Sequence, residues 1–155
     1  MAKTNRAATM NRLQSASRLA RTALAARLQG HGFYAGQDQI MLTLHEEDGQ
    51  TPGMLAQRLG VRPPTITKTI NRLQGQGYLD KRASETDARQ AHVFLTENGR
   101  MAIKAIEKAL RKTEKQAFRG LDKKEQKTLA KLLARVEANF AHMEPEPHEE
   151  DEAAD

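Results

Sequence analysis

The sequence contains no cysteine, and this absence excludes disulfide bonds, thiolate zinc sites and cysteine nucleophiles. It is consistent with a protein of the reducing cytoplasm, which is where we expect this one to act. There is also no run of about 18 consecutive apolar residues, the length that a membrane-spanning helix needs. We therefore expect no membrane partner.

Acidic residues are scarce over most of the chain. Residues 1–143 hold all 25 lysines and arginines but 13 of the 20 acidic residues, which gives them a net charge of +12. Residues 144–155 contain the other seven acids and no base, so the whole chain carries +5. A basic body with an acidic tail is typical of proteins that meet polyanions. The tail has almost no apolar surface to bury, and we expect it to be disordered.

The first 37 residues contain six basic residues and no acid, in an amphipathic pattern. Organellar transit peptides have the same composition, and this alternative stays open. Against it, the apolar spacing continues to Leu28 without an obvious cleavage region.

Catalytic residue types are present but not in catalytic arrangements. The chain has five histidines without metal-ligand spacing: His31, His45, His92, His142 and His148. The run His45-Glu46-Glu47 lacks the second histidine of a zinc-binding helix, and no glycine-rich phosphate loop is present. We predict no enzyme, no metal and no cofactor.

Apolar residues at helical spacing predict a first helix that runs to Leu28 and ends at Gly30. A second helix is predicted over residues 37–47. Thr51-Pro52 then begins a helix that ends at Gly60, because threonine is a good N-cap and proline fits the first turn. Pro63-Pro64 begins another helix after about three residues. Two short helices joined by such a turn form a helix-turn-helix.

The second helix of this pair has two different faces. Ile66, Ile70 and Leu73 lie at i, i+4 and i+7 and predict the buried face. The opposite face is polar: Pro64, Lys68, Asn71 and Arg72, flanked by Thr65 and Thr67. No acid occurs from Val61 to Leu79, whereas a solvated helix normally mixes both signs. Cations, hydroxyls and an amide suit phosphates and base edges, so this face predicts DNA contact, with an ordinary polar surface as the alternative.

Residues 78–82 and 92–96 alternate apolar and polar positions and predict two strands. The hairpin that they form directly after a helix-turn-helix is a wing, and its polar loop carries Arg89 near the tip. Thr96 is the predicted N-cap of a helix over residues 97–119. Its expected apolar side holds Met101, Ile103, Ile106, Leu110 and Phe118.

A last helix is predicted to begin after Asp122. These two long helices follow a domain that already has a core, and a second copy of the chain is the simplest partner that could cover them. The residues that we expect in this homodimer interface are Leu13, Leu129, Leu132, Leu133, Val136 and Phe140.

Three motifs in this order resemble the MarR family, the multiple-antibiotic-resistance regulators. Asp87-Ala-Arg89 followed by Leu95-Thr96 matches that family's wing pattern D-x-R-x5-L-T without a gap. Leu59-Gly-Val-Arg-Pro-Pro-Thr-Ile-Thr-Lys68 resembles its turn and recognition helix, and Leu73-x3-Gly77-Tyr-Leu-x-Lys-Arg82 its entry to the wing. The likeness covers roughly residues 10–142. Pro64 departs from the pattern, since the family commonly has a small polar residue there and proline has no N–H to donate.

The resemblance implies a dimeric transcriptional regulator that reads a pseudo-palindromic operator in duplex DNA. It places Arg89 in the minor groove. We expect Asp87 to orient Arg89 by an ion pair, and a pair that simply stabilises the hairpin is the alternative. Expected base readers are Thr65, Thr67 and Lys68, whereas Arg62, Arg72 and Arg82 are expected to hold phosphates. Arg72 could instead pair within the protein.

The resemblance also implies release of DNA on binding a small aromatic or anionic effector. Residues of this chain that would line the effector site are Arg18, Arg21, Tyr34, Met41 and Thr43. Alternatively, Thr43 bonds a backbone carbonyl four residues back, and both arginines are simply solvated.

The sequence thus predicts a mainly helical winged helix-turn-helix protein with a small β-hairpin. We expect a dimerisation helix in residues 1–36, a DNA-binding lobe in residues 37–96, dimerisation helices in residues 97–143 and a tail in residues 144–155. Two other functions stay open: an architectural protein that coats DNA without specificity or an effector, and a protein-interaction module that touches no DNA. The acid-free helix face argues against the second.

Overall fold

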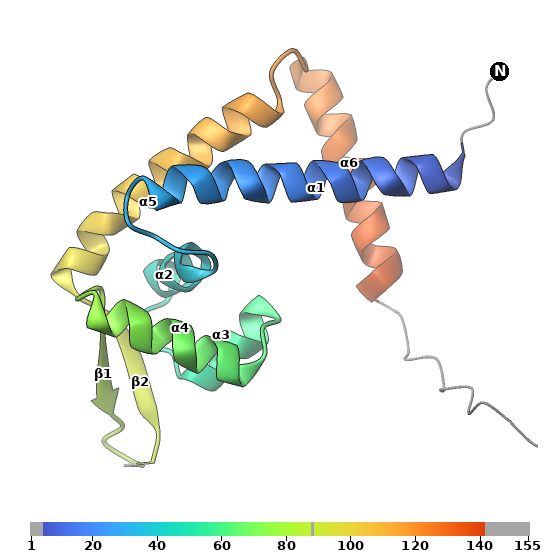
Figure 1. The fold of residues 1–155 in the computed structure, drawn as a ribbon. Helices are drawn as coiled ribbons and strands as arrows, with labels where there is room; N and C mark the ends of the chain where they lie inside the picture. Colours follow the sequence, from blue (N-terminus) through green and yellow to red (C-terminus); the bar gives the residue numbers. More distant parts are fainter. Residues whose placement is uncertain (1–4, 88, 142–155) are drawn as a thin grey trace, which may run out of the picture. The chain divides into compact units, whose positions relative to one another are not determined.

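The computed structural model describes residues 5–87 and 89–141 (Figure 1). The elements of these residues follow in the order α1, α2, α3, α4, β1, β2, α5, α6. The chain divides into two compact units, residues 1–117 with α1 to α5, and residues 118–155 with α6. The acidic tail, residues 144–155, lies outside the described residues.

The helix-turn-helix consists of α3 (Pro52–Leu59) and α4 (Pro63–Gly75). Thr51 caps α3, because its hydroxyl accepts a hydrogen bond from the Met54 backbone N–H at 3.2 Å. Gly60 ends α3 with a φ of 61°, a left-handed conformation that favours glycine, and the chain turns directly into α4. The predicted helix-turn-helix is confirmed.

A closed apolar core holds the first unit together. α2 (Gln37–Glu46) contributes to it beside α3, α4, the hairpin and α5. The largest fully buried apolar side chains are Ile40, Met41, Leu44, Leu55, Ile66, Ile70, Leu73, Leu79, Val93 and Ile106. Each such side chain stabilises the fold by about 1.5–3 kcal/mol relative to its exposed state. The lobe therefore has its own source of stability within a single chain.

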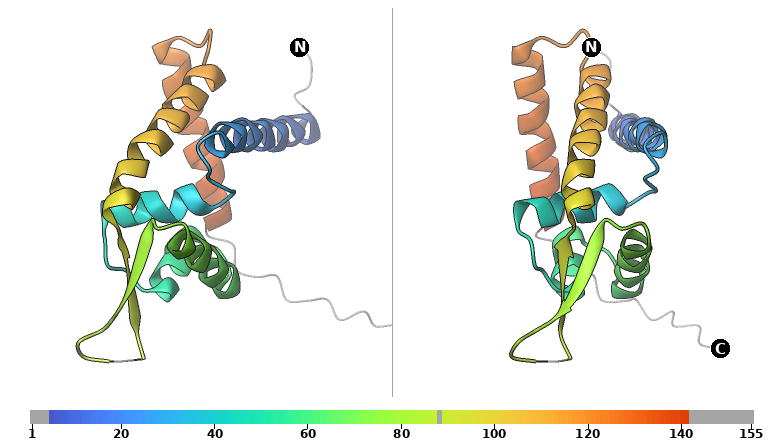
Figure 2. Two further views of the ribbon diagram at one scale, coloured as in Figure 1. Left: turned by 60° about the vertical axis from the view of Figure 1, so that its left-hand side comes forward. Right: turned by 90° about the vertical axis from the view of Figure 1, so that its left-hand side faces the viewer.

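Strands β1 (Leu79–Ala83) and β2 (Ala91–Leu95) form an antiparallel hairpin that projects from the lobe (Figure 2). Each strand is shifted by one residue from its predicted range. The shift has a physical reason at Thr96, whose hydroxyl accepts from the Gly99 N–H at 3.0 Å and donates to the Gly77 carbonyl at 2.6 Å. Thr96 thus caps the next helix, as predicted, instead of extending the strand.

Helices α1 (Arg6–Gln29) and α5 (Glu97–Ala117) pack against each other. Arg27 of α1 donates to the Thr113 hydroxyl at 3.0 Å and to the Gln116 side-chain oxygen at 2.8 Å. The prediction that Met101 lies on the apolar side of α5 is wrong, because its side chain is 67% exposed. Met101 precedes the buried Ile103 by two residues, and this spacing directs it to the opposite side of a helix.

The second unit contains α6 (Lys123–Ala141). Asp122 caps it as predicted, since its carboxylate accepts from the Glu125 N–H at 2.8 Å. No residue of α6 is buried, and Leu132 and Phe140 are 50% and 57% exposed. The apolar stripe of α6 is therefore largely uncovered in the single chain.

Candidate nucleic-acid interface

Helix α4 presents its polar face to solvent, as the sequence predicts. Ile66, Ile70 and Leu73 are buried against the core and fix the rotation of the helix. The exposed positions are Arg62, Pro64, Thr65, Thr67, Lys68, Asn71 and Arg72. The structure thus brings all of the predicted α4 residues to one accessible surface.

The first turn of α4 has few backbone donors to offer. Pro63 and Pro64 have no N–H, and the Thr65 N–H donates to the Arg62 carbonyl at 3.0 Å. Thr67 donates its hydroxyl proton to the Pro63 carbonyl at 3.1 Å and keeps only acceptor capacity. Donation to a ligand at this end of α4 therefore depends on side chains such as Arg62 and Lys68.

Neighbouring segments engage α4 on two sides. Lys81 of β1 donates to the Asn71 side-chain oxygen at 2.6 Å. The Arg72 guanidinium lies 3.9 Å from the centre of the Tyr34 ring, so Arg72 interacts within the protein, the alternative that the sequence left open. Our sequence reasoning missed Lys81, although the pair Lys81-Arg82 at the entry to the wing is a visible signal.

Besides Lys81, the wing carries the exposed cations Arg82 and Arg89. The Arg82 guanidinium lies 4.5 Å from the centre of the Phe94 ring. Arg89 is exposed near the tip, and its backbone N–H donates to the Asp87 carboxylate at 3.0 Å. Among the described residues no ion pair joins the two side chains. The predicted ion pair is thus replaced by a turn in which Asp87 holds the Arg89 backbone.

Three acidic residues that precede the helix-turn-helix in the sequence are paired. Arg58 of α3 binds both Glu46 and Glu47 at 3.2 Å, and Arg100 binds Asp48 at 3.4 Å. These pairs neutralise carboxylates that lie away from α4 in the sequence. The stretch from Val61 to Leu79 itself contains no acid.

The residues predicted to line an effector site differ in exposure, and no hydrogen bond or ion pair joins them among the described residues. Arg18 and Arg21 are exposed on α1, whereas Met41 is completely buried in the core. The Thr43 hydroxyl donates to the Gln39 carbonyl at 2.7 Å, which is the alternative given for it above. Tyr34 lies against Arg72.

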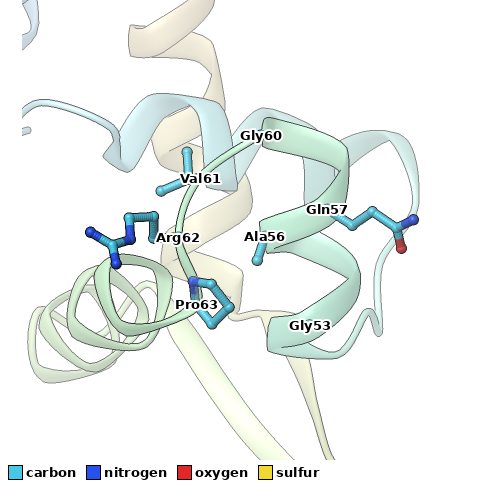
Figure 3. A pocket seen from close by; sticks show the side chains of 7 residues that line it. All are labelled: Gly53, Ala56, Gln57, Gly60, Val61, Arg62 and Pro63. Atoms are coloured by element: carbon cyan, nitrogen blue, oxygen red, sulfur yellow. The ribbon is translucent and has the colours of Figure 1, made fainter. Parts of the chain in front are cut away.

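A depression does occur at the turn of the helix-turn-helix (Figure 3). It opens broadly to solvent and is lined by Gly53, Ala56, Gln57, Gly60, Val61, Arg62 and Pro63. None of the predicted effector residues lines it.

No cluster of potential metal ligands occurs among the residues that the structure describes. None of the helices in that part of the chain is long and apolar enough to span a membrane.

Comparison with known proteins identifies the lobe. A MarR-family model matches residues 37–90, from α2 to the wing tip. Residues 37–90 form a MarR-family winged helix-turn-helix lobe. The family resemblance of the three sequence motifs is thereby confirmed, and so is the predicted fold class.

Solved structures of regulators share the fold over most of their length. A probable transcriptional regulator from Pseudomonas aeruginosa is 28% identical, with 80% of this chain and 92% of that chain covered and a TM-score of 0.72. A MarR transcriptional regulator from Methanosarcina mazei Go1 is 20% identical over 90% of this chain and 94% of that one, with a TM-score of 0.79. A mutant MarR from E. coli complexed with operator DNA is 20% identical over 81% and 91%, with a TM-score of 0.75.

Proposed function

We propose that this MarR-family protein is a homodimeric transcriptional regulator that binds a pseudo-palindromic operator in duplex DNA. In this proposal α4 enters the major groove and the wing enters the minor groove. One observation carries it: the exposed face of α4 offers Lys68, Asn71 and two threonines without any carboxylate from Val61 to Leu79. Such a face is suited to a polyanion with acceptors in its major groove.

The distribution of roles follows from position. Thr65, Thr67 and Lys68 lie on the first two turns of α4 and are proposed to read bases. Arg62, Arg72 and Arg82 lie at the margins and are proposed to contact phosphates. Arg89, with its backbone held by Asp87, is proposed to enter the minor groove, where narrow A·T-rich tracts concentrate negative potential.

The homodimer is supported by the uncovered apolar side chains of the long helices. Leu129, Leu133 and Val136 are only half-buried in α6, and Leu13 is half-buried in α1. A two-fold dimer would cover these side chains and place two copies of α4 on successive major grooves.

A small aromatic or anionic effector is the second, finer part of the proposal. Its support is the family resemblance and the two exposed guanidinium groups of Arg18 and Arg21 on α1. Met41 gives no support for an effector site, since it is buried, and Thr43 gives none, since its hydroxyl bonds a carbonyl of its own helix. A shift of the DNA-binding midpoint by salicylate or benzoate, lost in Arg21→Ala, would support this part.

The competing function is an architectural protein that coats DNA. Selection of bound duplexes from a random pool separates the two functions. A regulator enriches a two-fold-symmetric motif, whereas a coating protein enriches none.

Three single substitutions then test the proposed roles, each titrated across a salt series. Arg89→Ala should lose most affinity at operators with A·T-rich flanks. Lys68→Ala should relax base preference within each half-site, at a cost of about 1–3 kcal/mol. Arg82→Ala should weaken all duplexes equally and lower the slope of log K against log salt by about one per half-site.

Lys108→Ala on α5 is the matched control, because it removes an exposed cation outside the proposed surface. Equal losses for the three variants on every duplex would contradict the division of roles. Unchanged binding by all three would remove α4 and the wing from the DNA interface.

A further inference from the structure

Tyr34, in the segment between α1 and α2, lies against the recognition helix. Its ring centre is 3.9 Å from the Arg72 guanidinium carbon, and its side chain is 48% exposed. Half of the tyrosine surface thus stays in contact with solvent. The contact is not part of the apolar core. The simplest reason for it is that Tyr34 acts on the exposed surface of α4.

Hydrogen bonds fix the Tyr34 segment to the end of α4. The Gln37 side chain accepts from the Tyr34 backbone N–H at 3.0 Å and donates to the Gln76 side-chain oxygen at 2.8 Å. The Gln76 amide in turn donates to the Gly32 carbonyl at 3.2 Å. Gln37 is only 1% exposed, so a buried amide determines where the Tyr34 backbone lies.

Stacking leaves the donor edges of Arg72 free. A guanidinium presents five N–H donors in one plane, and an aromatic ring beneath it occupies only the face. Within the described residues the Arg72 side chain makes no hydrogen bond and no ion pair. Arg72 also lies one helical turn beyond Lys68, at the margin of the proposed base-reading surface. An oriented guanidinium with free donors is suited to a phosphate.

We propose that Tyr34 is a positioning residue for DNA binding, which holds Arg72 in the orientation that contacts a backbone phosphate beside the major groove. The proposal rests on the DNA-binding function argued above. A free arginine side chain loses rotamer entropy when it binds, whereas Arg72 has lost part of it in the folded protein. Tyr34 therefore contributes to affinity through Arg72 without touching DNA.

A double-mutant cycle on the full-length protein tests this relation. The variants are Tyr34→Leu, Arg72→Gln and the double variant, with Tyr34→Phe as the control that keeps the ring. Arg72→Gln should weaken operator binding and lower the salt slope by about one per half-site. Tyr34→Leu should weaken binding about two- to fivefold per half-site, the usual strength of an exposed cation–π contact. In the Arg72→Gln background the same substitution should have no effect, and Tyr34→Phe should bind as the original protein does.

Two binding outcomes overturn the proposal. Arg72→Gln with unchanged affinity and salt slope means that Arg72 contacts no phosphate. A Tyr34→Leu loss that persists in the Arg72→Gln background means that Tyr34 does not act through Arg72.

A measurement on the free protein keeps the proposal separate from the DNA-binding function. The chain has two tyrosines and no tryptophan, so Tyr34 is the sole strong fluorophore in a Tyr78→Phe background. Arg72→Gln should change its emission by removing the stacked cation, and unchanged emission overturns the stack whether or not DNA binds. By contrast, if Lys68→Ala binds every duplex with the same affinity as the original protein, the result counts against the proposed function itself.

Discussion

The helix-turn-helix lobe and helix α6 differ in how much of their apolar surface they bury. In the lobe, Leu44, Ile70 and Leu73 have no measurable exposure. In α6 no residue is buried, although Leu129, Leu133 and Val136 recur at the same i, i+4, i+7 spacing as the buried apolar residues of α4. α1 resembles α6 in this respect, since Leu28 is its only buried residue.

This difference separates two sources of stability. The lobe draws its free energy of folding from side chains of one chain, and its stability should not depend on protein concentration. The exposed apolar side chains of α1 and α6 contribute to stability only when another surface buries them. If that surface belongs to a second copy of the chain, the stability of these helices should depend on protein concentration. In the function proposed above, the lobe presents a surface to DNA, and α1 and α6 hold two such surfaces together.

The largest effect is expected from charges placed on the α6 stripe. Leu129→Glu combined with Leu133→Glu should make the protein monomeric, because two carboxylates would be buried in the interface. Loss of the second half-site should then lower operator affinity by about 100-fold or more. Sedimentation measures the oligomeric state, and titration with the selected operator measures the affinity.

Ala134→Glu is the matched control, because it adds a charge to the same helix about 100° or more away from the stripe. The control should remain dimeric and bind DNA. A double variant that stays dimeric would show that α6 is not the interface.

A smaller effect, confined to the lobe, is expected from Ile70→Ala. Ile70 is completely buried, and removal of its side chain should lower the free energy of unfolding by about 2–5 kcal/mol. Urea denaturation measures this loss, which should be the same at low and high protein concentration. Gln74→Ala, on the exposed side of α4, should change stability by less than about 0.5 kcal/mol. An Ile70→Ala loss that varied with concentration would contradict a lobe stabilised within one chain.

The sequence predicts the features of this protein that depend on local signals, and it does not predict those that depend on contacts between distant segments. The sequence located α3 and α4 to within a residue or two, because Thr51-Pro52, Gly60 and the pair Pro63-Pro64 are local signals that fix helix ends. The strand ends were wrong by one residue, because the role of Thr96 depends on its distant contact with the Gly77 carbonyl. The sequence also could not give the Tyr34–Arg72 stack, which joins residues from two elements through a buried glutamine.

The candidate site shows the same limit. Exposure of Lys68 and its neighbours followed from helical spacing, and this part is confirmed. The partners of Asn71 and Arg72 did not follow, since Lys81 and Tyr34 approach α4 only in three dimensions. For Thr43 the sequence could not choose between an effector and a backbone carbonyl four residues back, and the structure shows a bond to the Gln39 carbonyl.

The smallest effect concerns Asp38, an exception to apolar burial in the lobe. Asp38 is 7% exposed, and desolvation raises the pKa of its carboxyl above the ordinary value, although hydrogen bonds from the Asp38 and Gln39 backbone N–H groups oppose the rise. The folded protein therefore holds this proton more tightly than the unfolded chain does. Below about pH 4 both states are protonated and burial of the carboxyl carries no charge penalty. As pH rises through the folded-state pKa, the charged group is buried and stability falls.

Asp38→Asn should remove this dependence, because an amide has nearly the same shape and does not ionise. We expect a small rise in the urea midpoint at pH 7 that disappears as the pH approaches 4, and it should be well below the change at Ile70. Asp80→Asn, at an exposed position of β1, should give no such rise at either pH. If Asp38→Asn instead destabilised the lobe at pH 7, the backbone hydrogen bonds that the carboxylate accepts at the start of α2 would outweigh its desolvation, and the charged form would be the one that the lobe prefers.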